Sequence, residues 1–279
     1  METHAILCDL QAPYHSRRAV DVACQILEEL KPTTLTFNGD VIDCRKLALR
    51  YPSDDGAADG LISELEEELE RSGTLVRKVI GAAITEGMRI NWTDGNHEYR
   101  IWRAMATSPV TMQLMTVPSL REATSALALM GLKEFTINYA GLYPNGFWLR
   151  GDAPVEENFW VEHGYIVRQK ASYTANALLD KRLSNVICGH VERMACVPKK
   201  VVGPSGDRMF YAIEGGALSG IGEKGIGEGI YTGIPHSVPS YMDHHLGFWI
   251  LTFAEKMWYP EPVYIRNGTA LFRGKIYKA

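Results

Sequence analysis

Five short polar segments of this sequence contain residue types that bind metal ions or transfer protons. Each follows an apolar run of the kind that forms a buried strand. In chain order they are DLQ at 9–11, GDVID at 39–43, GNHE at 95–98, HG at 163–164 and GHVE at 189–192. A lone aspartate at a strand end is more often a turn or a helix cap than a ligand. Five such segments in one chain argue against coincidence, so we predict a shared metal-binding or proton-transfer site.

The first hundred residues alternate between strand and helix patterns that would bring these segments together. The expected elements are a strand at 3–9, a helix at 16–30 with Ser16 as its N-cap, a strand at 33–40, a helix at 61–84 and a strand at 88–98. This alternation predicts a parallel sheet. Ligands bind beyond the carboxyl ends of the strands in such sheets. We therefore expect Asp9, Asp40 and Asn96 to lie at one sheet edge.

The rest of the chain changes character twice. We interpret residues 99–150, which include a helical stretch at 118–132, as a helical cap or insertion between two core segments. Strand and helix patterns then recur, and from about 196 to 279 the pattern is β-rich. A chain of 279 residues allows one large domain or two small ones. We interpret residues 1–279 as a single domain.

Composition limits the class of protein. With 46% hydrophobic residues the chain can bury a sizeable core, which excludes a disordered or fibrous protein. A formal net charge of −4 argues against a protein that mainly coats nucleic acid, although a local basic groove stays compatible with it. The five cysteines include no CxxC pair, and neither a signal peptide nor a membrane-spanning run is recognisable. We expect a cytoplasmic protein without membrane contact.

The ordered set of polar segments resembles the signature of the calcineurin-like metallophosphoesterases. That signature runs D-x-H, GDxxD, GNH[DE], H-G and G-H-x-H, and the likeness covers roughly residues 5–192. DLQ and GHVE each depart from it by one residue. The resemblance implies an α/β fold, namely a four-layer αββα sandwich of two mixed β-sheets flanked by helices. The compact size and the motif variants are similar to those of bacteriophage members, for which the location would be the host cytoplasm.

The same resemblance implies a metal-dependent hydrolysis of phosphoesters. Two divalent cations about 3.5–4 Å apart would hold a hydroxide, neutralise the phosphate oxygens and stabilise the charge that develops in line. Asp40 would bridge both cations and so take part in catalysis. The first cation would be held by Asp40, Asn96, His163 and His190. This mixed set of nitrogen and oxygen donors suits Mn, Fe, Zn or Ni.

The second cation position would be formed by Asp9, Gln11, Asp40 and Glu192. Oxygen donors stand at Gln11 and Glu192, where the family has histidines. Either this position is degraded and weakly occupied, or it is a harder, all-oxygen site that favours Mn²⁺ or Mg²⁺ over Zn²⁺. Three carboxylates still supply negative charge there, so we favour the second interpretation, with Mn²⁺ as the metal.

His97 is, by the same resemblance, a catalytic residue that protonates the leaving oxygen or stabilises the phosphate. An imidazole suits either task because its pKa lies near neutrality. Asp43 and Glu98 are more typical of positioning residues. Arg100 and Arg103 follow GNHE and could bind phosphate, since a guanidinium bonds phosphate bidentately. A solvated helix face or a structural ion pair explains each of these arginines equally well.

We predict a phosphodiesterase, with monoesters also open as substrates and a nucleotide or cyclic nucleotide as the favoured substrate. A DNA or RNA nuclease is the alternative among enzymes, but it needs a basic groove, and the cap supplies only a modest one. A phosphoprotein phosphatase ranks third. A non-catalytic metal-binding scaffold is the alternative of a different class, because Gln11 and Glu192 depart from the signature.

Overall fold

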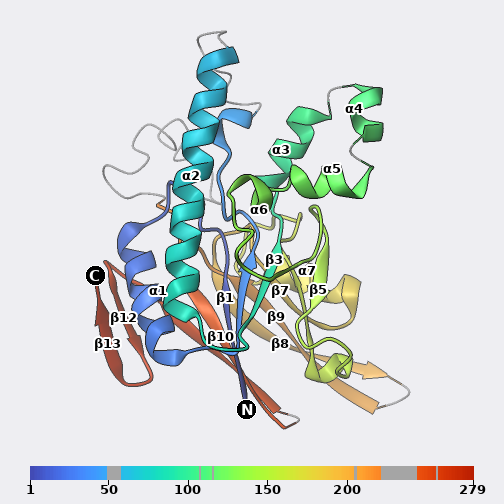
Figure 1. The fold of residues 1–279 in the computed structure, drawn as a ribbon. Helices are drawn as coiled ribbons and strands as arrows, with labels where there is room; N and C mark the ends of the chain where they lie inside the picture. The colour runs from blue at the N-terminus through green and yellow to red at the C-terminus, as the bar shows by residue number, and fades with distance from the viewer. Residues whose placement is uncertain (49–57, 107, 115, 204–205, 221–243, 256) are drawn as a thin grey trace.

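The structure is a computed structural model that describes residues 1–48, 58–106, 108–114, 116–203, 206–220, 244–255 and 257–279. Over these ranges the chain is a mixed α/β protein with two large mixed β-sheets, a separate two-stranded hairpin and seven α-helices (Figure 1). The hairpin is formed by β12 (Thr269–Phe272) and β13 (Lys275–Lys278), which lie beside α1 (Arg17–Leu30).

The first sheet has six strands in the order β11-β10-β1-β2-β3-β4. They are β1 (Glu2–Leu7), β2 (Thr34–Asn38), β3 (Arg89–Thr93), β4 (Ile137–Tyr139), β10 (Gly247–Ala254) and β11 (Met257–Tyr264). β1 to β4 are parallel, whereas β10 and β11 add antiparallel strands at the β1 edge. Helices α1 and α2 (Ala58–Ala83) connect β1 to β2 and β2 to β3. The predicted parallel sheet is therefore confirmed.

The second sheet has five strands in the order β5-β6-β7-β9-β8. They are β5 (Gly146–Trp148), β6 (Phe159–Glu162), β7 (Asn185–Cys188), β8 (Met194–Gly203) and β9 (Gly206–Gly215). β6, β7 and β9 run parallel, so their carboxyl ends share one edge. Helix α7 (Tyr173–Arg182) connects β6 to β7.

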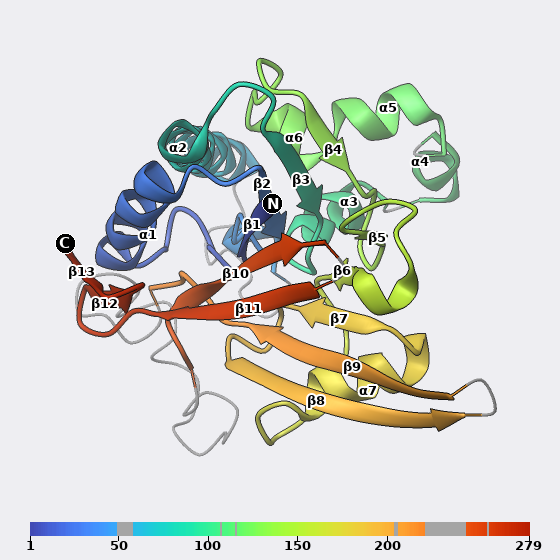
Figure 2. The ribbon, with the colours of Figure 1, turned by 90° about the horizontal axis from the view of Figure 1, so that it is seen from below.

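Three clusters of buried hydrophobic side chains pack these elements together. The largest joins the first sheet to α1 and α2, and it includes Leu27 and Phe37. The second combines residues of both sheets, such as Ile6 of β1 and Phe159 of β6. The third packs Leu178 of α7 against β7 and β9. Figure 2 shows α1 and α2 beside the first sheet, on the side away from β7, β8 and β9.

Helix α1 begins at the N-cap that the sequence predicts. The Ser16 hydroxyl accepts a hydrogen bond from the backbone N–H of Ala19 at 3.2 Å. This bond satisfies one of the backbone donors that the first turn leaves without an intrahelical partner. The helix ends at Leu30, and its C-cap is Lys31, whose backbone is left-handed and whose N–H donates to the Leu27 carbonyl.

Residues 98–150 contain four short helices followed by two strands. The helices are α3 (Glu98–Met105), α4 (Pro109–Leu114), α5 (Pro118–Ala123) and α6 (Ala126–Leu129). The helical stretch expected at 118–132 is divided between α5 and α6, because the Ser125 hydroxyl caps a new helix by accepting from the Ala128 N–H. β4 then forms the edge strand of the first sheet, and β5 forms the edge strand of the second. This segment is therefore only partly helical.

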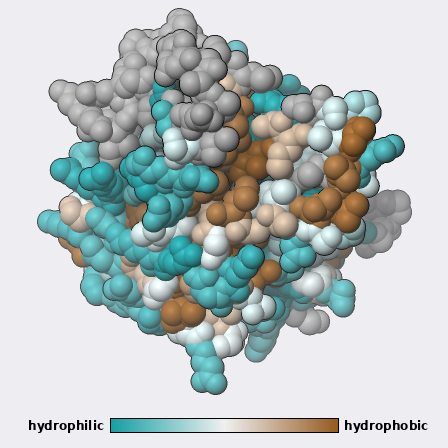
Figure 3. Space-filling model, turned by 45° about the horizontal axis from the view of Figure 1, so that its top comes forward, coloured by the Kyte–Doolittle hydropathy of each residue, from teal (hydrophilic) through white to brown (hydrophobic). Residues whose placement is uncertain are grey.

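Helices α4 and α5 bury none of their residues and expose a group of large apolar side chains. The group comprises Val110, Met112, Leu114, Val117 and Leu120, of which Val110 is 66% exposed. Apolar side chains gather on the right of Figure 3, the side on which Figure 1 has α4 and α5. Among the helices of the described ranges, none has the length and apolarity needed to cross a membrane.

Candidate metal centre

The polar segments meet where the carboxyl ends of the two sheets approach each other. Asp9 follows β1, Asp40 follows β2, and Asn96 follows β3 in the first sheet. His163 follows β6, and His190 follows β7 in the second sheet. Each sheet thus contributes part of one site, as the position of these segments at strand ends predicts.

Asp40, His163 and His190 form a cluster that could hold a metal ion. One carboxylate oxygen and one ring nitrogen from each histidine all lie within 4.8 Å of one another. His163 Nε2 is 3.3 Å from Asp40 Oδ2 and 3.2 Å from Asn96 Oδ1, so the amide of Asn96 adjoins the cluster. His163 Nδ1 lies 3.1 Å from the Asn38 carbonyl oxygen. This carbonyl can hold an Nδ1–H, which leaves Nε2 as the ligand atom.

The backbone around the cluster is held in an uncommon conformation. Five of the predicted metal ligands have left-handed φ angles, between +47° and +69°: Asp9, Gln11, Asp40, His190 and Glu192. Such conformations in residues other than glycine cost free energy and concentrate at functional sites. The preceding Gly39 is also left-handed, and a Cβ there would lie 2.4 Å from His163 Nδ1. Only glycine allows this close approach of the β2 turn to the imidazole.

Asp9 presents a buried oxygen that has no partner in the described structure. Its Oδ2 accepts a hydrogen bond from the His190 backbone N–H at 3.0 Å. Its Oδ1 is buried and forms no hydrogen bond with any described residue. Burial raises the pKa of Asp9 well above its usual range, and the Asp40 carboxylate adds to this effect. An unpaired buried oxygen of this kind is costly, and a cation at this position would satisfy it.

Charge in the cluster is distributed unevenly. Burial raises the pKa of Asp40, but the neighbouring His163 and His97 outweigh it and hold the pKa below its usual range. The Asp40 carboxylate overcomes the effect of burial on His163 and raises the pKa of that imidazole to about 10. Burial, assisted by His163, lowers the pKa of His190 to about 4. His190 is therefore a neutral imidazole at pH 7, which is the form that binds metals.

Gln11 and Glu192 lie beside the cluster and contact each other. Gln11 Nε2 donates to Glu192 Oε1 at 3.0 Å, and the Ser219 hydroxyl donates to Oε2 at 3.1 Å. His244 Nδ1 is 3.5 Å from the same Oε2. Burial raises the pKa of Glu192 to about 8. The Glu192 carboxyl is thus shared by three neighbouring side chains.

His97 connects the cluster to Asp43. Its backbone N–H donates to Asp40 Oδ1 at 2.9 Å, and its Nε2 lies 3.5 Å from Asp40 Oδ2. On the other side of the ring, Nδ1 is 2.8 Å from Asp43 Oδ1. Arg100 donates to the Asp43 carbonyl oxygen at 2.6 Å and lies 3.3 Å from Oδ1. The His97 ring therefore lies between the two acids, with Nε2 toward Asp40 and Nδ1 toward Asp43.

Glu98 holds the turn that carries Asp40. Its Oε2 accepts from the backbone N–H groups of Asp40 at 3.0 Å and Gly95 at 2.7 Å. Its Oε1 accepts from Val41 at 2.7 Å and Ile42 at 2.9 Å. Four backbone donors are satisfied by one buried carboxylate, which ties the GNHE turn to the GDVID turn.

The two arginines proposed to bind phosphate lie in different environments. Arg100 is buried and engaged by Asp43, whereas Arg103 is exposed on α3. Three further residues that the sequence does not predict border this site. Ser219 and His244 contact Glu192, and the Tyr143 ring centroid is 6.2 Å from that of His163. No motif marks these three residues, because each is far from the polar segments in sequence.

Comparisons with known proteins identify no family for this chain. No protein-family model matches it, and no curated protein matches it. Among solved structures, the crystal structure of TT1561 from Thermus thermophilus is similar over 94% of this chain and 98% of that chain, with a TM-score of 0.37 and 8% sequence identity. At this level the likeness assigns neither a family nor an activity to the chain.

Proposed function

We propose that this chain is a metal-dependent phosphoesterase of the calcineurin-like type that hydrolyses phosphodiesters in preference to monoesters. The observation that carries the proposal is the convergence of Asp40, His163 and His190 beside the unpartnered Oδ1 of Asp9. Three buried hydrophobic clusters support the further proposal of a four-layer αββα sandwich, with the two sheets as the inner layers.

The residues of the cluster fit a divalent cation. Asp40, Asn96, His163 and His190 would hold it through oxygen and nitrogen donors, a set that suits Mn²⁺. When bound, such a cation supplies Lewis acidity toward the phosphate and lowers the pKa of water. The Asn38 carbonyl fixes the His163 ring, and Asp43 fixes the His97 ring, so the chain holds its ligands and its proton donor in place.

We propose a second, harder cation position at Asp9, Gln11, Asp40 and Glu192. At this position Gln11 and Glu192 are joined by the hydrogen bond from Gln11 Nε2 to Glu192 Oε1. Asp9 Oδ1 is a buried oxygen without a hydrogen bond to any described residue. Oxygen donors alone favour Mn²⁺ or Mg²⁺ over Zn²⁺, so Mn²⁺ is the metal proposed for both positions.

His97 is the residue proposed to move a proton. Its Nε2 lies 3.5 Å from Asp40 Oδ2, while Asp43 Oδ1 lies 2.8 Å from Nδ1 on the other side of the ring. A proton held at Nε2 could pass to the leaving oxygen of the ester, or the N–H could bond a phosphate oxygen. The chemistry needs no residue that forms a covalent bond with phosphorus.

One set of assays tests the proposal. Purified protein with Mn²⁺ is given bis-p-nitrophenyl phosphate, p-nitrophenyl phosphate, cyclic nucleotides and single-stranded DNA. We expect turnover of the diester, loss of this turnover in Asp40→Asn and Asn96→Ala, and no loss in Asp180→Asn, a matched acid on the exposed surface of α7. Hydrolysis of the single-stranded DNA without hydrolysis of the small diesters would favour the nuclease. Metal binding without turnover of any substrate would favour the scaffold.

A further inference from the structure

A large cavity lies between the short helices of residues 98–150 and the strand segment that follows them. Its volume is about 1020 Å³, and it is lined from 118 to 145 by parts of α5, α6, β4 and the turn before β5. Pockets that bind small molecules usually measure about 300–1000 Å³. This cavity therefore has room for more than one nucleotide-sized group.

The cavity borders the candidate metal centre at Tyr143. The Tyr143 ring lines the cavity, and its edge faces the His163 ring, with the ring centroids 6.2 Å apart. The Tyr143 ring also packs against Tyr99, which follows GNHE on α3, with the ring centroids 5.9 Å apart. A molecule whose phosphate lies at the cluster could therefore extend past Tyr143 into the cavity.

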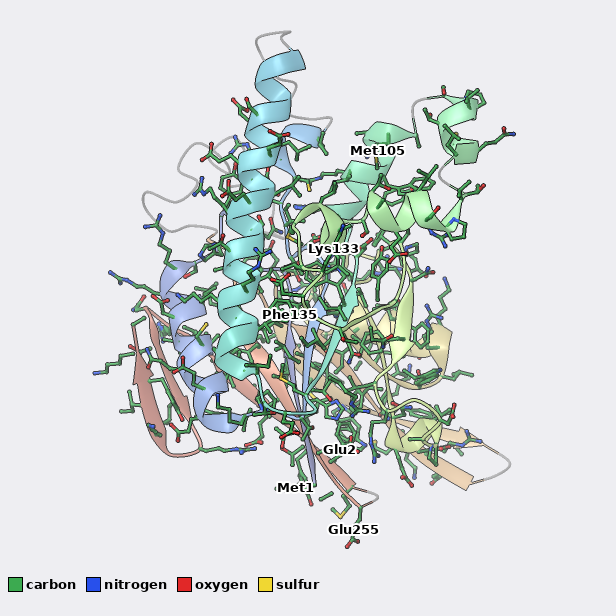
Figure 4. All side chains as sticks on the ribbon, viewed as in Figure 1. Met1, Glu2, Met105, Lys133, Phe135 and Glu255 are labelled. Carbon is green, nitrogen blue, oxygen red and sulfur yellow. The ribbon has the colours of Figure 1, made fainter. Side chains whose placement is uncertain are left out.

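The lining combines positive charge with aromatic surface. Arg121 and Lys133 line the cavity, and both are exposed to solvent. Neither side chain forms an ion pair or a hydrogen bond with any residue that the structure describes. Glu122 is the sole acid of the lining, so the charge there is positive in a chain whose net charge is −4. Phe135 lies near Lys133 on the segment that leads from α6 to β4 (Figure 4).

We propose that this cavity binds the neighbouring nucleotide of a short single-stranded oligonucleotide whose scissile phosphate lies at the metal centre. This inference rests on the proposed function and extends it to a substrate class. Arg121 and Lys133 would contact a second backbone phosphate, and the rings of Phe135 and Tyr143 would stack on a base. A single-phosphate substrate, such as a cyclic nucleotide, has no second phosphate for the Arg121 and Lys133 side chains to contact. A phosphopeptide has no bases that could stack on the aromatic rings of the lining.

Binding without turnover tests the inference. The full chain, kept free of divalent cations by a chelator, is titrated into fluorescein-labelled hexathymidylate while anisotropy is recorded at several salt concentrations. We expect Arg121→Ala/Lys133→Ala to weaken binding about tenfold or more. Each neutralised phosphate of a single strand contributes about −0.7 to the slope of log K against log salt. Because both side chains are proposed to contact one phosphate, the slope should become shallower by about 0.7. Lys199→Ala/Lys200→Ala removes the same charge from β8 and should leave both values unchanged.

A kinetic measurement separates this inference from the proposed function. With Mn²⁺ present, the Arg121/Lys133 double variant should raise KM for a 5′-phosphorylated dinucleotide about tenfold and leave hydrolysis of bis-p-nitrophenyl phosphate as it is. Equal affinities and salt slopes for wild type and the double variant would overturn the inference, even if diester hydrolysis is intact. So would tight binding of a phosphoserine peptide in place of hexathymidylate. Absence of all hydrolysis alongside binding that depends on Arg121 and Lys133 would overturn the proposed function alone.

Discussion

At the scale of single residues, Asp40 carries the strongest constraint in this site. Its Oδ2 lies next to the His97 and His163 imidazoles, and its Oδ1 accepts the His97 backbone N–H. Burial opposes a charge on Asp40, but the two imidazoles outweigh it and lower its pKa. The result is a buried carboxylate that stays ionised, in contrast to Asp9, whose pKa burial raises well above its usual range. Positive charge on the His163 imidazole, whose pKa Asp40 raises to about 10 against the effect of burial, offsets this buried carboxylate.

The role of His97 predicts a loss of activity that depends on the leaving group. His97→Gln should lower kcat about 100-fold or more for a diester with an alkyl leaving group, because general acid catalysis contributes about 10²–10⁴. For p-nitrophenolate, which leaves without a proton, the loss should be much smaller. Calorimetric titration with Mn²⁺ should show unchanged affinity. Equal losses for both leaving groups would mean that His97 only supports Asp40.

Gln11 and Glu192 predict a change in metal preference. Gln11→His/Glu192→His places two imidazoles beside Asp9 in place of oxygen donors. Because imidazole suits Zn²⁺ better than carboxylate or amide oxygen does, the second equivalent of Zn²⁺ should bind at least about tenfold tighter than in the wild type. Competitive titration of Zn²⁺ against Mn²⁺ measures this, with Ser219→Ala as a control that leaves both donors in place. An unchanged second equivalent would exclude these residues from a metal position.

At the scale of elements, the strands and turns that carry the polar segments were predictable from sequence. Each segment combines a buried strand with an abrupt polar turn, and both signals are local. The division of 118–132 into α5 and α6 was not predictable from periodicity, because the Ser125 hydroxyl caps a helix only once the chain has turned. Contacts of His244 with Glu192 and of Tyr143 with His163 depend on how distant segments pack, which no local pattern encodes.

The Glu98 carboxylate bridges the GNHE and GDVID turns by accepting four backbone hydrogen bonds. This bridge predicts that turn stability and metal binding are coupled. Glu98→Gln replaces one acceptor oxygen with an NH₂ group that would face two backbone donors. The free energy of unfolding should fall by about 2–4 kcal/mol, since each buried donor left without a partner costs about 1–3 kcal/mol. Affinity for Mn²⁺ should fall as well, because the turn carries Asp40. Urea denaturation and calorimetry measure both, and Glu66→Gln on the exposed face of α2 is the matched control.

Stability retained in Glu98→Gln with weakened Mn²⁺ binding would show that the bridge positions Asp40 without stabilising the fold. If neither quantity changes, the four backbone donors must find other acceptors in the variant, and the bridge is dispensable.

At the scale of the whole molecule, the site depends on both sheets at once. Asp9 and Asp40 extend from the first sheet, whereas His163 and His190 extend from the second. The cluster of Ile6, Phe159 and their neighbours packs between residues of both sheets and fixes this relation. A cation bound by residues of both sheets would therefore stabilise their association, by an amount that grows with its concentration above the dissociation constant.

This dependence predicts how stability changes with pH when the metal is removed. Burial raises the pKa of several carboxyls, among them Glu68 and Glu98 to about 7 and Asp94 and Glu192 to about 8. Near the cluster, Asp40 raises the pKa of His163 to about 10 against the effect of burial. A group whose pKa is raised by folding contributes stability that is lost as pH rises through the folded value. Burial lowers the pKa of His4 and His15 to about 4, which matters only below about pH 6.5.

Above pH 6.5 these shifts therefore act in one direction, and the metal-free protein should lose stability between pH 6.5 and 8.5. Each extra proton bound by the folded state changes the free energy of unfolding by about 1.4 kcal/mol per pH unit. Mn²⁺ should reverse the trend, because it replaces the protons on His163 and Glu192, and fewer protons compete with it at higher pH.

Thermal unfolding with a chelator and with Mn²⁺ at both pH values measures this. The rise in Tm on adding Mn²⁺ should be larger at pH 8.5 in the wild type and small at both values in Asp40→Asn. An equal rise in Tm at the two pH values would mean that the cation binds away from the groups whose pKa is raised. It would then bind outside the cluster that joins the sheets.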